Sequence, residues 1–535
     1  MEQIEIFIGL LGIIATVGIL FRKVSVPTSL LLVIIGMLIS LLPFMPEVHI
    51  KSALVLDIFL PLLIYEMSAE TSWREMKLNL RPILSLSIGH VLFITAFVAF
   101  VIHSLVPELG WPLAIVLGAI VAPPDDVAIM AIAEKAHIPG RILTILRSEA
   151  MLNDATALIL FRFALAAYFT HYFSPASAFG AFLLIVLGET IYGIALGNFM
   201  GKIRLSLTDP RQQMLFSFIT PFIAYFPAER LGGCGVLATA VTGLVIGHRY
   251  YDRFLPEVRL VTRSVWTSIS FAIQSIMFLL IGLNLKYIID RVDDIMSHEK
   301  MAYYSAILVV TVIIGRFLWT YPSAYLPRFF SKKIREKDPY PPWQYPFVVS
   351  WAGMRGSISL AAAFSIPVIA NPVLGSHTQD VIIFFTFSVI CGTLLIQGLT
   401  LPWLLKALGV AHYHQQEQRF EELNELKARK KMTQAAILWL SEYEIIVKDE
   451  PKLKSEVALQ IERYKMRKQE LATRIKSLKN GDEQGEIEHL TSSLHLSSKI
   501  LDVERKELSR LWHNDEISHA SRNKLLLQLD HRSKH

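Results

Sequence analysis

The feature of this sequence that most constrains its fold is a series of long apolar segments separated by short polar breaks. A helix needs about 20 apolar residues to cross the hydrocarbon core of a bilayer, which is roughly 30 Å thick. Over the whole chain 53% of residues are hydrophobic and 18% are charged, against about 25% charged in soluble domains. We therefore predict an all-α polytopic membrane protein with about thirteen transmembrane helices. They are expected near residues 4–21, 27–45, 52–70, 82–103, 111–133, 142–171, 178–201, 214–228, 234–247, 264–285, 303–326, 346–369 and 379–405.

The basic residues of the polar breaks follow an alternating pattern. Eighteen Lys and Arg residues fall in one set of alternate breaks, and five fall in the other set. Cytoplasmic loops of membrane proteins are enriched in Lys and Arg. The pattern therefore predicts an odd number of spans, with the N-terminus outside and the C-terminus in the cytoplasm. The formal net charge of +6 mostly reflects the same loops and does not indicate nucleic-acid binding.

The composition changes at about Gly409, from apolar to charged and helix-favouring. Apolar residues recur at three- and four-residue intervals from Val457 to Leu478, which is the pattern of an amphipathic helix. We predict a transmembrane domain at 1–408 and a cytoplasmic helical region at 409–535. The second region is either a regulatory or dimer-supporting module or a solubilising tail.

Ionisable residues inside the predicted spans are few, and such residues mark ion pathways, proton relays or buried pairs. Those singled out here are Glu66, Asp125, Asp126, Arg147, Glu149, Asp154, Arg162, Arg316 and Arg355. At 100° per residue along a helix, Glu149 and Asp154 point in different directions. One carboxylate can therefore bind transported ions while the other pairs with an arginine. We expect Glu149 to form a structural ion pair with Arg355, because the neighbouring Gly353 and Gly356 permit close helix approach.

The segment APPDDVA at 122–128 interrupts the fifth predicted span. Prolines remove helical hydrogen bonds, so we expect the chain to unwind there and to leave free carbonyl oxygens near Asp125. These carbonyls, the carboxylates of Asp125 and Asp154 and the amide of Asn153 suit a monovalent cation. A proton and a cation compete for the same carboxylates, and exchange follows if the site crosses the membrane only when it is neutralised. The alternative is that Asp125 only caps the interrupted helix.

Two stretches resemble bacterial sodium/proton antiporters of the NhaP type, which are related to the eukaryotic sodium/hydrogen exchangers. They are 118–167, which contains LNDATAL, and WAGMRGSISLAAAFSIP at 351–367. LPLLIYE at 60–66, SIMFLLIGLNL at 275–285 and the helical tail extend the likeness over nearly the whole chain. The resemblance implies a thirteen-helix inverted-repeat fold in the bacterial inner membrane, homodimers, and a six-helix core that moves against a dimerisation domain. It also implies electroneutral exchange of Na+ or Li+ for H+, with a role in pH and sodium homeostasis.

The resemblance further implies a role for individual residues. Asp154 is the carboxylate that binds the ion and the proton, Asn153 is its neighbour in the Asn-Asp pair, and Asp125 assists from the unwound span. Glu149 and Arg355 form the structural pair, and Glu66 supports the site.

The chain departs from the family pattern at two places. Asp126 stands where the family has Pro or Ala, and residues 147–150 read Arg-Ser-Glu-Ala in place of Glu-Gly-Glu-Ser. A serine ligand is therefore absent from the face of Asp154, and the positive charge of Arg147 lies two turns below it. For this reason K+/H+ antiport is the alternative to Na+/H+ antiport.

Other functional classes find less support in the sequence. A cation channel and a transport-dead membrane sensor are the less favoured alternatives, and the absence of a repeated filter-like Gly-Tyr-Gly motif argues against the channel. The pairing of Tyr-Asp with Gly-x-Gly-Asp that intramembrane aspartyl proteases carry is also missing, so we expect no enzyme activity. No nucleotide-binding loop or site for an organic cofactor is indicated.

Overall fold

The structure is a computed structural model of two compact units, residues 1–414 and 415–535. It describes residues 2–20, 27–42, 52–125, 130, 138–292, 295, 297–367, 377–446, 451–480, 504, 506–508 and 510–511. Every element among these residues is helical, and they contain no strand. This agrees with the predicted all-α class.

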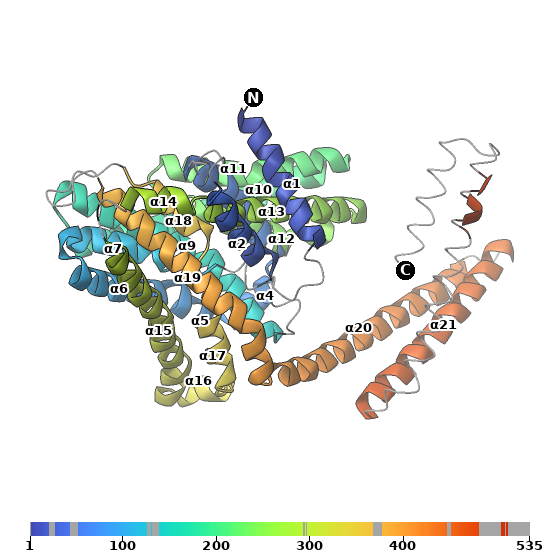
Figure 1. The fold of residues 1–535 in the computed structure, drawn as a ribbon. Coiled ribbons are helices and arrows are strands. Elements are labelled where there is room, and N and C mark those ends of the chain that lie inside the picture. Colours follow the sequence, from blue (N-terminus) through green and yellow to red (C-terminus); the bar gives the residue numbers. More distant parts are fainter. Residues whose placement is uncertain are drawn as a thin grey trace. The chain divides into compact units, whose positions relative to one another are not determined.

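The elements of the first unit follow one another as a long series of helices (Figure 1). They are α1 (Glu2–Leu20), α2 (Thr28–Ser40), η1 (Leu54–Phe59), α3 (Leu60–Glu70), α4 (Trp73–Leu78), α5 (Leu80–Leu84), η2 (Ser85–His90), α6 (Val91–Leu105), η3 (Pro107–Leu109), α7 (Gly110–Val121), α9 (Gly140–Thr170), α10 (Pro175–Ser206), α11 (Pro210–Arg230), α12 (Val236–Arg249), η4 (Tyr251–Arg253), α13 (Pro256–Leu283), α14 (Leu285–Val292), α15 (His298–Phe330), α16 (Lys332–Lys337), α17 (Gln344–Trp351), α18 (Ser357–Phe364) and α19 (Thr378–Ala407).

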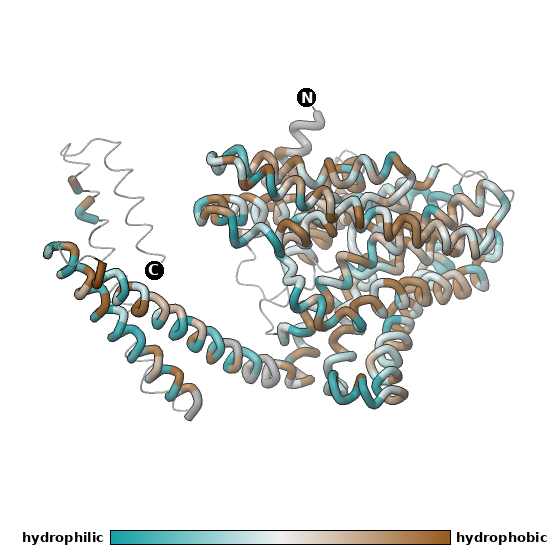
Figure 2. Tube along the Cα trace, turned by 180° about the vertical axis from the view of Figure 1, so that it is seen from behind, coloured by the Kyte–Doolittle hydropathy of each residue, from teal (hydrophilic) through white to brown (hydrophobic). Residues whose placement is uncertain are grey.

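Each predicted apolar segment contains helix in the structure. Within the described residues, six helical stretches are long and apolar enough to cross a membrane: Leu80–Leu105, Gly140–Thr170, Pro175–Ser206, Pro256–Val292, His298–Phe330 and Thr378–Ala407. Four shorter apolar helices accompany them: Ile8–Leu20, Thr28–Ser40, Pro107–Val121 and Val236–Arg249. Figure 2 shows apolar residues along most helices of the first unit. The polytopic membrane class is therefore confirmed, while the number of thirteen spans stays a prediction.

The helices of the first unit pack in two groups. The scaffold group consists of α1, α2, α3 and α10–α13, in which α2 packs on α13 and α12 packs on both α3 and α10. The core group consists of α5, α6, α7, α9, α15 and α17–α19, in which α7 packs on α6 and α9. Small residues permit this packing: a Cβ at Gly282 of α13 would overlap the Val33 carbonyl of α2. An ion-binding site at the interface between the two groups would change its surroundings if the groups moved relative to one another.

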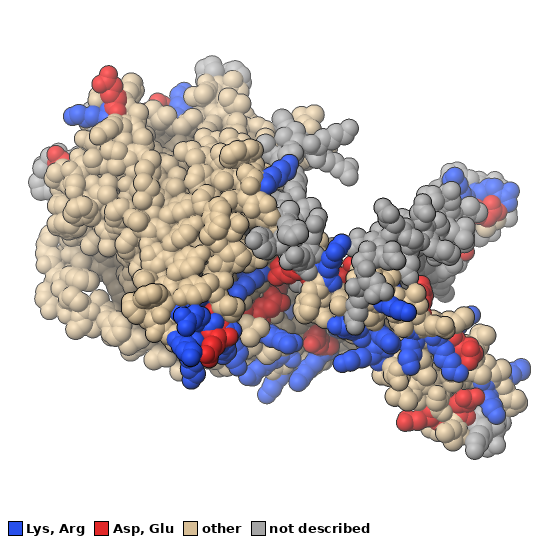
Figure 3. Space-filling view, turned by 90° about the horizontal axis from the view of Figure 1, so that it is seen from below, with Lys and Arg blue, Asp and Glu red and all other residues tan. Residues whose placement is uncertain are grey.

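The outer surface of the first unit is largely apolar. Exposed large side chains such as Leu184, Leu187 and Ile191 lie on α10, whose apolar window is only 11% buried. Seen from below in Figure 3, a wide area carries no Lys, Arg, Asp or Glu, and charged side chains gather in patches. An apolar surface of this kind suits contact with lipid or with another membrane helix.

The second unit contains most of α20 (Val410–Ile446) and all of α21 (Pro451–Asn480). Polar residues predominate along both helices (Figure 2). Arg474 of α21 donates to Glu422 of α20 over 2.9 Å. The helix α21 covers the amphipathic pattern predicted from Val457 to Leu478.

Candidate functional site

Two non-helical stretches of the core group meet at one point. The helix α7 ends at Val121, and residues 122–125 continue without helical structure; α17 and α18 are separated by the non-helical residues 352–356. The backbone N–H of Asp125 donates to the carbonyl oxygen of Met354 over 2.7 Å. A Cβ at Gly356 would overlap the Asp125 carboxylate, so only glycine leaves room for this approach. The predicted unwinding at the Pro-Pro pair is therefore present.

Arg355 lies fully buried between these broken helices. Its Nε donates to the Val121 carbonyl over 2.6 Å and its Nη1 donates to the Gly353 carbonyl over 2.7 Å. The guanidinium thus satisfies the last carbonyl of α7, where the helix dipole is negative, and one carbonyl of its own non-helical stretch. Its backbone N–H donates to Thr393 Oγ1 of α19 over 3.1 Å.

Arg355 was predicted to form the ion pair with Glu149, and this prediction is wrong. Glu149 of α9 pairs with Arg316 of α15, which donates to both carboxylate oxygens, with Nη2 at 2.7 Å from Oε2. The side chains are 0% and 1% exposed. The guanidinium of Arg355 is hydrogen-bonded to backbone carbonyls of the non-helical stretches. Arg316 lies on the continuous helix α15 and faces Glu149.

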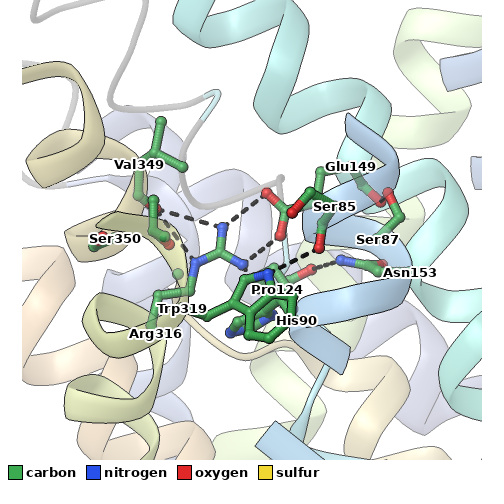
Figure 4. Close-up of polar contacts among 12 residues, drawn as sticks. Ser85, Ser87, His90, Pro124, Glu149, Asn153, Arg316, Trp319, Val349 and Ser350 are labelled. Atoms are coloured by element: carbon green, nitrogen blue, oxygen red, sulfur yellow. Dashed lines mark hydrogen bonds and ion pairs between the residues drawn. The ribbon is translucent and has the colours of Figure 1, made fainter. Parts of the chain in front are cut away.

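The Glu149–Arg316 pair is part of a larger network (Figure 4). Arg316 also contacts the Val349 carbonyl of α17 at 3.4 Å, and its Nη1 lies 3.2 Å from Nδ1 of the fully buried His90. Ser87 donates to the Glu149 carbonyl over 3.3 Å. The pair therefore connects α9, α15, α17 and η2, and we assign it a structural role in the core group.

Asn153 and Asp154 lie on α9 one turn beyond Glu149. The buried Asn153 donates through Nδ2 to the Pro124 carbonyl over 3.4 Å, which ties α9 to the unwound segment (Figure 4). Its Oδ1 atom is buried without a hydrogen-bond partner in the described part of the chain. Asp154 is 9% exposed.

Asp154 and Asp125 line the same cavity, which has a volume of about 440 Å³. The cavity lies between the two helix groups. The core group contributes Ser357 and Ser359 of α18 besides the two aspartates. The scaffold group contributes polar side chains from α3 and α13: Glu66, Glu70, Thr267, Ser270, Gln274 and Ser275. The structure thus brings Asp154, Asp125 and Glu66 to one cavity, and Asp126 lies outside the described residues.

The cavity is lined by oxygen-bearing side chains, which are hard ligands for small cations. No group of three or more His, Cys, Asp or Glu side chains able to hold a metal ion occurs among the residues that the structure describes. Carboxylate, hydroxyl and amide oxygens are nevertheless concentrated around Asp125 and Asp154. Such oxygens beside a broken helix are typical of sodium and proton sites in transporters.

The family model for the transmembrane part of sodium/hydrogen exchangers matches residues 11–407. The chain belongs to the sodium/hydrogen exchanger family. This confirms the resemblance to NhaP-type antiporters, and cation/proton antiport follows from membership of the family.

Individual sodium/hydrogen exchanger relatives support the assignment. A Mycobacterium tuberculosis protein named as an uncharacterized Na+/H+ exchanger is 30% identical over 439 residues, which are 81% of this chain and 78% of the relative. A Bacillus subtilis antiporter named for sodium, potassium, lithium and rubidium is 30% identical over 416 residues, or 76% and 62% of the two chains. The sodium proton antiporter MjNhaP1 from Methanocaldococcus jannaschii has the same fold, with a TM-score of 0.61 and 16% identity over 76% of this chain and 98% of that one.

Glu189 is a buried carboxylate that the sequence reasoning missed in this exchanger. It lies on α10, is 5% exposed, and accepts backbone N–H bonds from Cys234, Gly235 and Ala238 at 2.6, 3.2 and 3.1 Å. The carboxylate therefore caps the N-terminus of α12 from a neighbouring helix. Its position inside the predicted span 178–201 is the signal that could have identified it.

Arg162 forms a second connection that sequence reasoning left unassigned. It lies on α9, and its Nη2 donates to both carboxylate oxygens of Glu229 on α11, at 2.7 and 2.6 Å. Its Nη1 donates to the Gly233 carbonyl. This pair joins the core group to the scaffold group two turns away from Asp154.

Proposed function

We propose that the chain exchanges Na+ or Li+ for H+ across the bacterial inner membrane, with Asp154, Asp125 and Asn153 as the binding site. The observation that carries this proposal is the contact between the non-helical residues 122–125 and 352–356, which places Asp125 at the cavity that Asp154 also lines. The cavity lies between two helix groups, so a relative movement of the groups would expose the same carboxylates to either side of the membrane.

Competition between a proton and a cation for this site explains why their movements are coupled. A proton or a cation neutralises the carboxylates, and either one lowers the cost of carrying the site past apolar surroundings. The empty charged site does not cross, so the two ions move in opposite directions. We propose electroneutral exchange that serves pH and sodium homeostasis. In this mechanism Glu66 supports the cavity from α3, and the Glu149–Arg316 pair holds the core group together.

We further propose a homodimer with the N-terminus outside and the C-terminus in the cytoplasm. The uneven distribution of Lys and Arg between alternate loops supports this orientation. The transmembrane domain at 1–408 then carries transport, and the region at 409–535 is cytoplasmic. The exposed apolar face of α10 offers a surface for a second copy.

Potassium is the alternative substrate. The side chain of Arg147 lines the cavity that contains Asp154, and the name of the Bacillus subtilis relative includes potassium and rubidium. The experiment below tests the choice between sodium and potassium together with transport itself.

The experiment is proton flux in proteoliposomes with an imposed pH gradient. Na+, Li+ and K+ are added in turn to the native chain, to Asp154→Asn and to Asp380→Asn. Asp380 is the matched control because its carboxylate is also buried, at 4% exposed, but pairs with Arg291 on α14 and lines neither large cavity. We expect Na+ or Li+ to dissipate the gradient in the native chain and in the control only. Retention of flux in Asp154→Asn would refute the proposed site, and a response to K+ alone would replace sodium by potassium.

A further inference from the structure

A second cavity, of about 540 Å³, adjoins the cavity that contains Asp154. Glu66, Glu70 and Arg147 line both cavities. We propose that this second cavity is a binding site for a phosphate-bearing anion. We call it the arginine cavity, because its lining includes Arg74, Arg147, Arg204, Arg259 and Arg263.

The charge of the arginine cavity is unusual for the surroundings of a cation site. Five arginines line the cavity against three acidic residues, Glu66, Glu70 and Asp252. The excess of two positive charges matches a phosphate monoester, which carries about −1.5 to −2 at neutral pH. Guanidinium groups also bind phosphate oxygens in a bidentate manner. An anion of this class therefore complements the cavity in charge and in hydrogen bonding.

Arg204 provides the most direct argument for anion binding. Its side chain is only 3% exposed, although it lies in the last turn of α10. The guanidinium carbon stands 4.4 Å from the centre of the Phe254 ring, and Nε is buried without a hydrogen-bond partner in the described part of the chain. No carboxylate of the described residues pairs with it. The contacts with Tyr65 and Phe254 offset only part of the cost of burying this charge, and an anion would offset more of it.

Enrichment of arginines in loops on one side of the membrane does not explain this arrangement. Loop arginines are expected to extend into water, as Arg253 does. Arg74 and Arg263 come from different elements, α4 and α13, and yet line one cavity with Arg204. Neither pairs with a carboxylate among the residues that the structure describes. Convergence of these side chains from separate elements on one cavity indicates a ligand site rather than a general surface charge.

The remaining lining suits a compact organic phosphate. Trp73, Tyr251 and Trp266 contribute aromatic surface, and Trp266 is oriented by a 3.0 Å hydrogen bond from Nε1 to Ser217 Oγ. Arg259 is held in place by the carbonyls of Asp252 and Phe254. The volume accommodates inorganic phosphate, a small phosphate ester or the headgroup of an anionic lipid. All three share the phosphate chemistry that the arginines recognise.

Binding can be measured without transport, so its failure is distinguishable from failure of the proposed exchange. The purified full-length protein in detergent is titrated with inorganic phosphate and, separately, with glycerol 3-phosphate, at constant ionic strength set with chloride. A third arm uses phosphatidylcholine nanodiscs with and without phosphatidylglycerol. The readout in each arm is the midpoint of thermal unfolding, which rises when a ligand binds the folded state only.

We expect a saturable rise of the midpoint in at least one arm. A rise with inorganic phosphate or glycerol 3-phosphate identifies a soluble phosphate as the source, and a rise only with phosphatidylglycerol identifies a lipid headgroup. Either result supports the anion site. No saturable rise in any of the three arms overturns it.

Variants locate the binding. Arg204→Gln removes the buried charge, and Arg74→Gln and Arg263→Gln remove exposed charges whose loss does not threaten folding. Each is expected to weaken binding about tenfold, the effect of losing one charge-assisted hydrogen bond. Arg253→Gln is the matched control, because Arg253 lies in the adjacent η4 but does not line the arginine cavity. Equal weakening in the control, or unchanged affinity in both Arg74→Gln and Arg263→Gln, refutes the assignment.

Discussion

The partner of Glu149 can be determined by double-mutant cycles on the free energy of unfolding. The carboxylate is 0% exposed and Arg316 is 1% exposed, so replacing either one by glutamine leaves the other charge buried without its partner. Breaking a buried pair in this way costs about 3 to 5 kcal/mol. Removing both charges leaves no isolated ion, so the double variant should lose much less than the sum of the two single losses.

Each single variant loses the same Glu149–Arg316 interaction, so the sum of the two losses in unfolding free energy counts that interaction twice. The expected coupling energy between Glu149→Gln and Arg316→Gln is therefore about 2 to 4 kcal/mol. The cycle with Arg355→Gln is the matched control. Arg355 donates to the Val121 and Gly353 carbonyls, so it shares no hydrogen bond with Glu149. Its coupling to Glu149 is expected to stay below about 1 kcal/mol.

The assay is unfolding of the detergent-solubilised protein by increasing sodium dodecyl sulfate, followed by tryptophan fluorescence. Trp319 lies one turn from Arg316 on α15 and donates to the Ser85 carbonyl over 2.9 Å, so its emission reports on this region (Figure 4). A coupling with Arg355 as large as that with Arg316 would refute the assigned pairing. A loss below about 1 kcal/mol in Glu149→Gln would refute the argument from burial.

Three further predictions follow from other contacts. Gly356→Ala should reduce sodium-driven proton flux at least tenfold, because the added methyl group displaces the Asp125 carboxylate; native flux in the variant would contradict this. Glu189→Gln should lower the free energy of unfolding by about 1 to 3 kcal/mol, because a charged acceptor at the N-terminus of α12 is lost; an unchanged thermal midpoint would show that the cap contributes nothing. Asp338, in the loop after α16, accepts from Arg141 and Arg328 at 2.8 and 2.6 Å. Burial raises the pKa of the Asp338 carboxyl, but these two arginines outweigh burial and hold it below the usual value. Its stabilising contribution is therefore present above the unfolded pKa of about 3.9 and is lost as the pH falls through the folded value. The thermal midpoint of Asp338→Asn should thus lie below that of the native protein at pH 7, and the difference should narrow towards about pH 3; a constant difference would contradict the reasoning.

The broken helix at 122–125 was predictable because its cause is local. Two prolines remove hydrogen bonds from their own helix wherever that helix is placed, and aspartate is too costly in lipid to stand there without a function. The second break, at 352–356, has no proline and was not predicted. There Arg355 and Gly356 are stabilised in non-helical conformation by contacts with Val121 and Asp125, which lie more than 200 residues away in the sequence.

The sequence by itself determined the class of the protein, the positions of its apolar segments, and the small set of ionisable residues from which a site could be built. These properties depend on the transfer of each segment from water to lipid and on the hydrogen bonds of each helix with itself. Only the tertiary structure decided which of those residues meet. Glu149 and Arg316 are 167 residues apart, and the sequence favoured Arg355 because of its neighbouring glycines. The choice depends on which guanidinium is already occupied by backbone carbonyls and which one faces α9 from a continuous helix, and that is settled by how the helices pack.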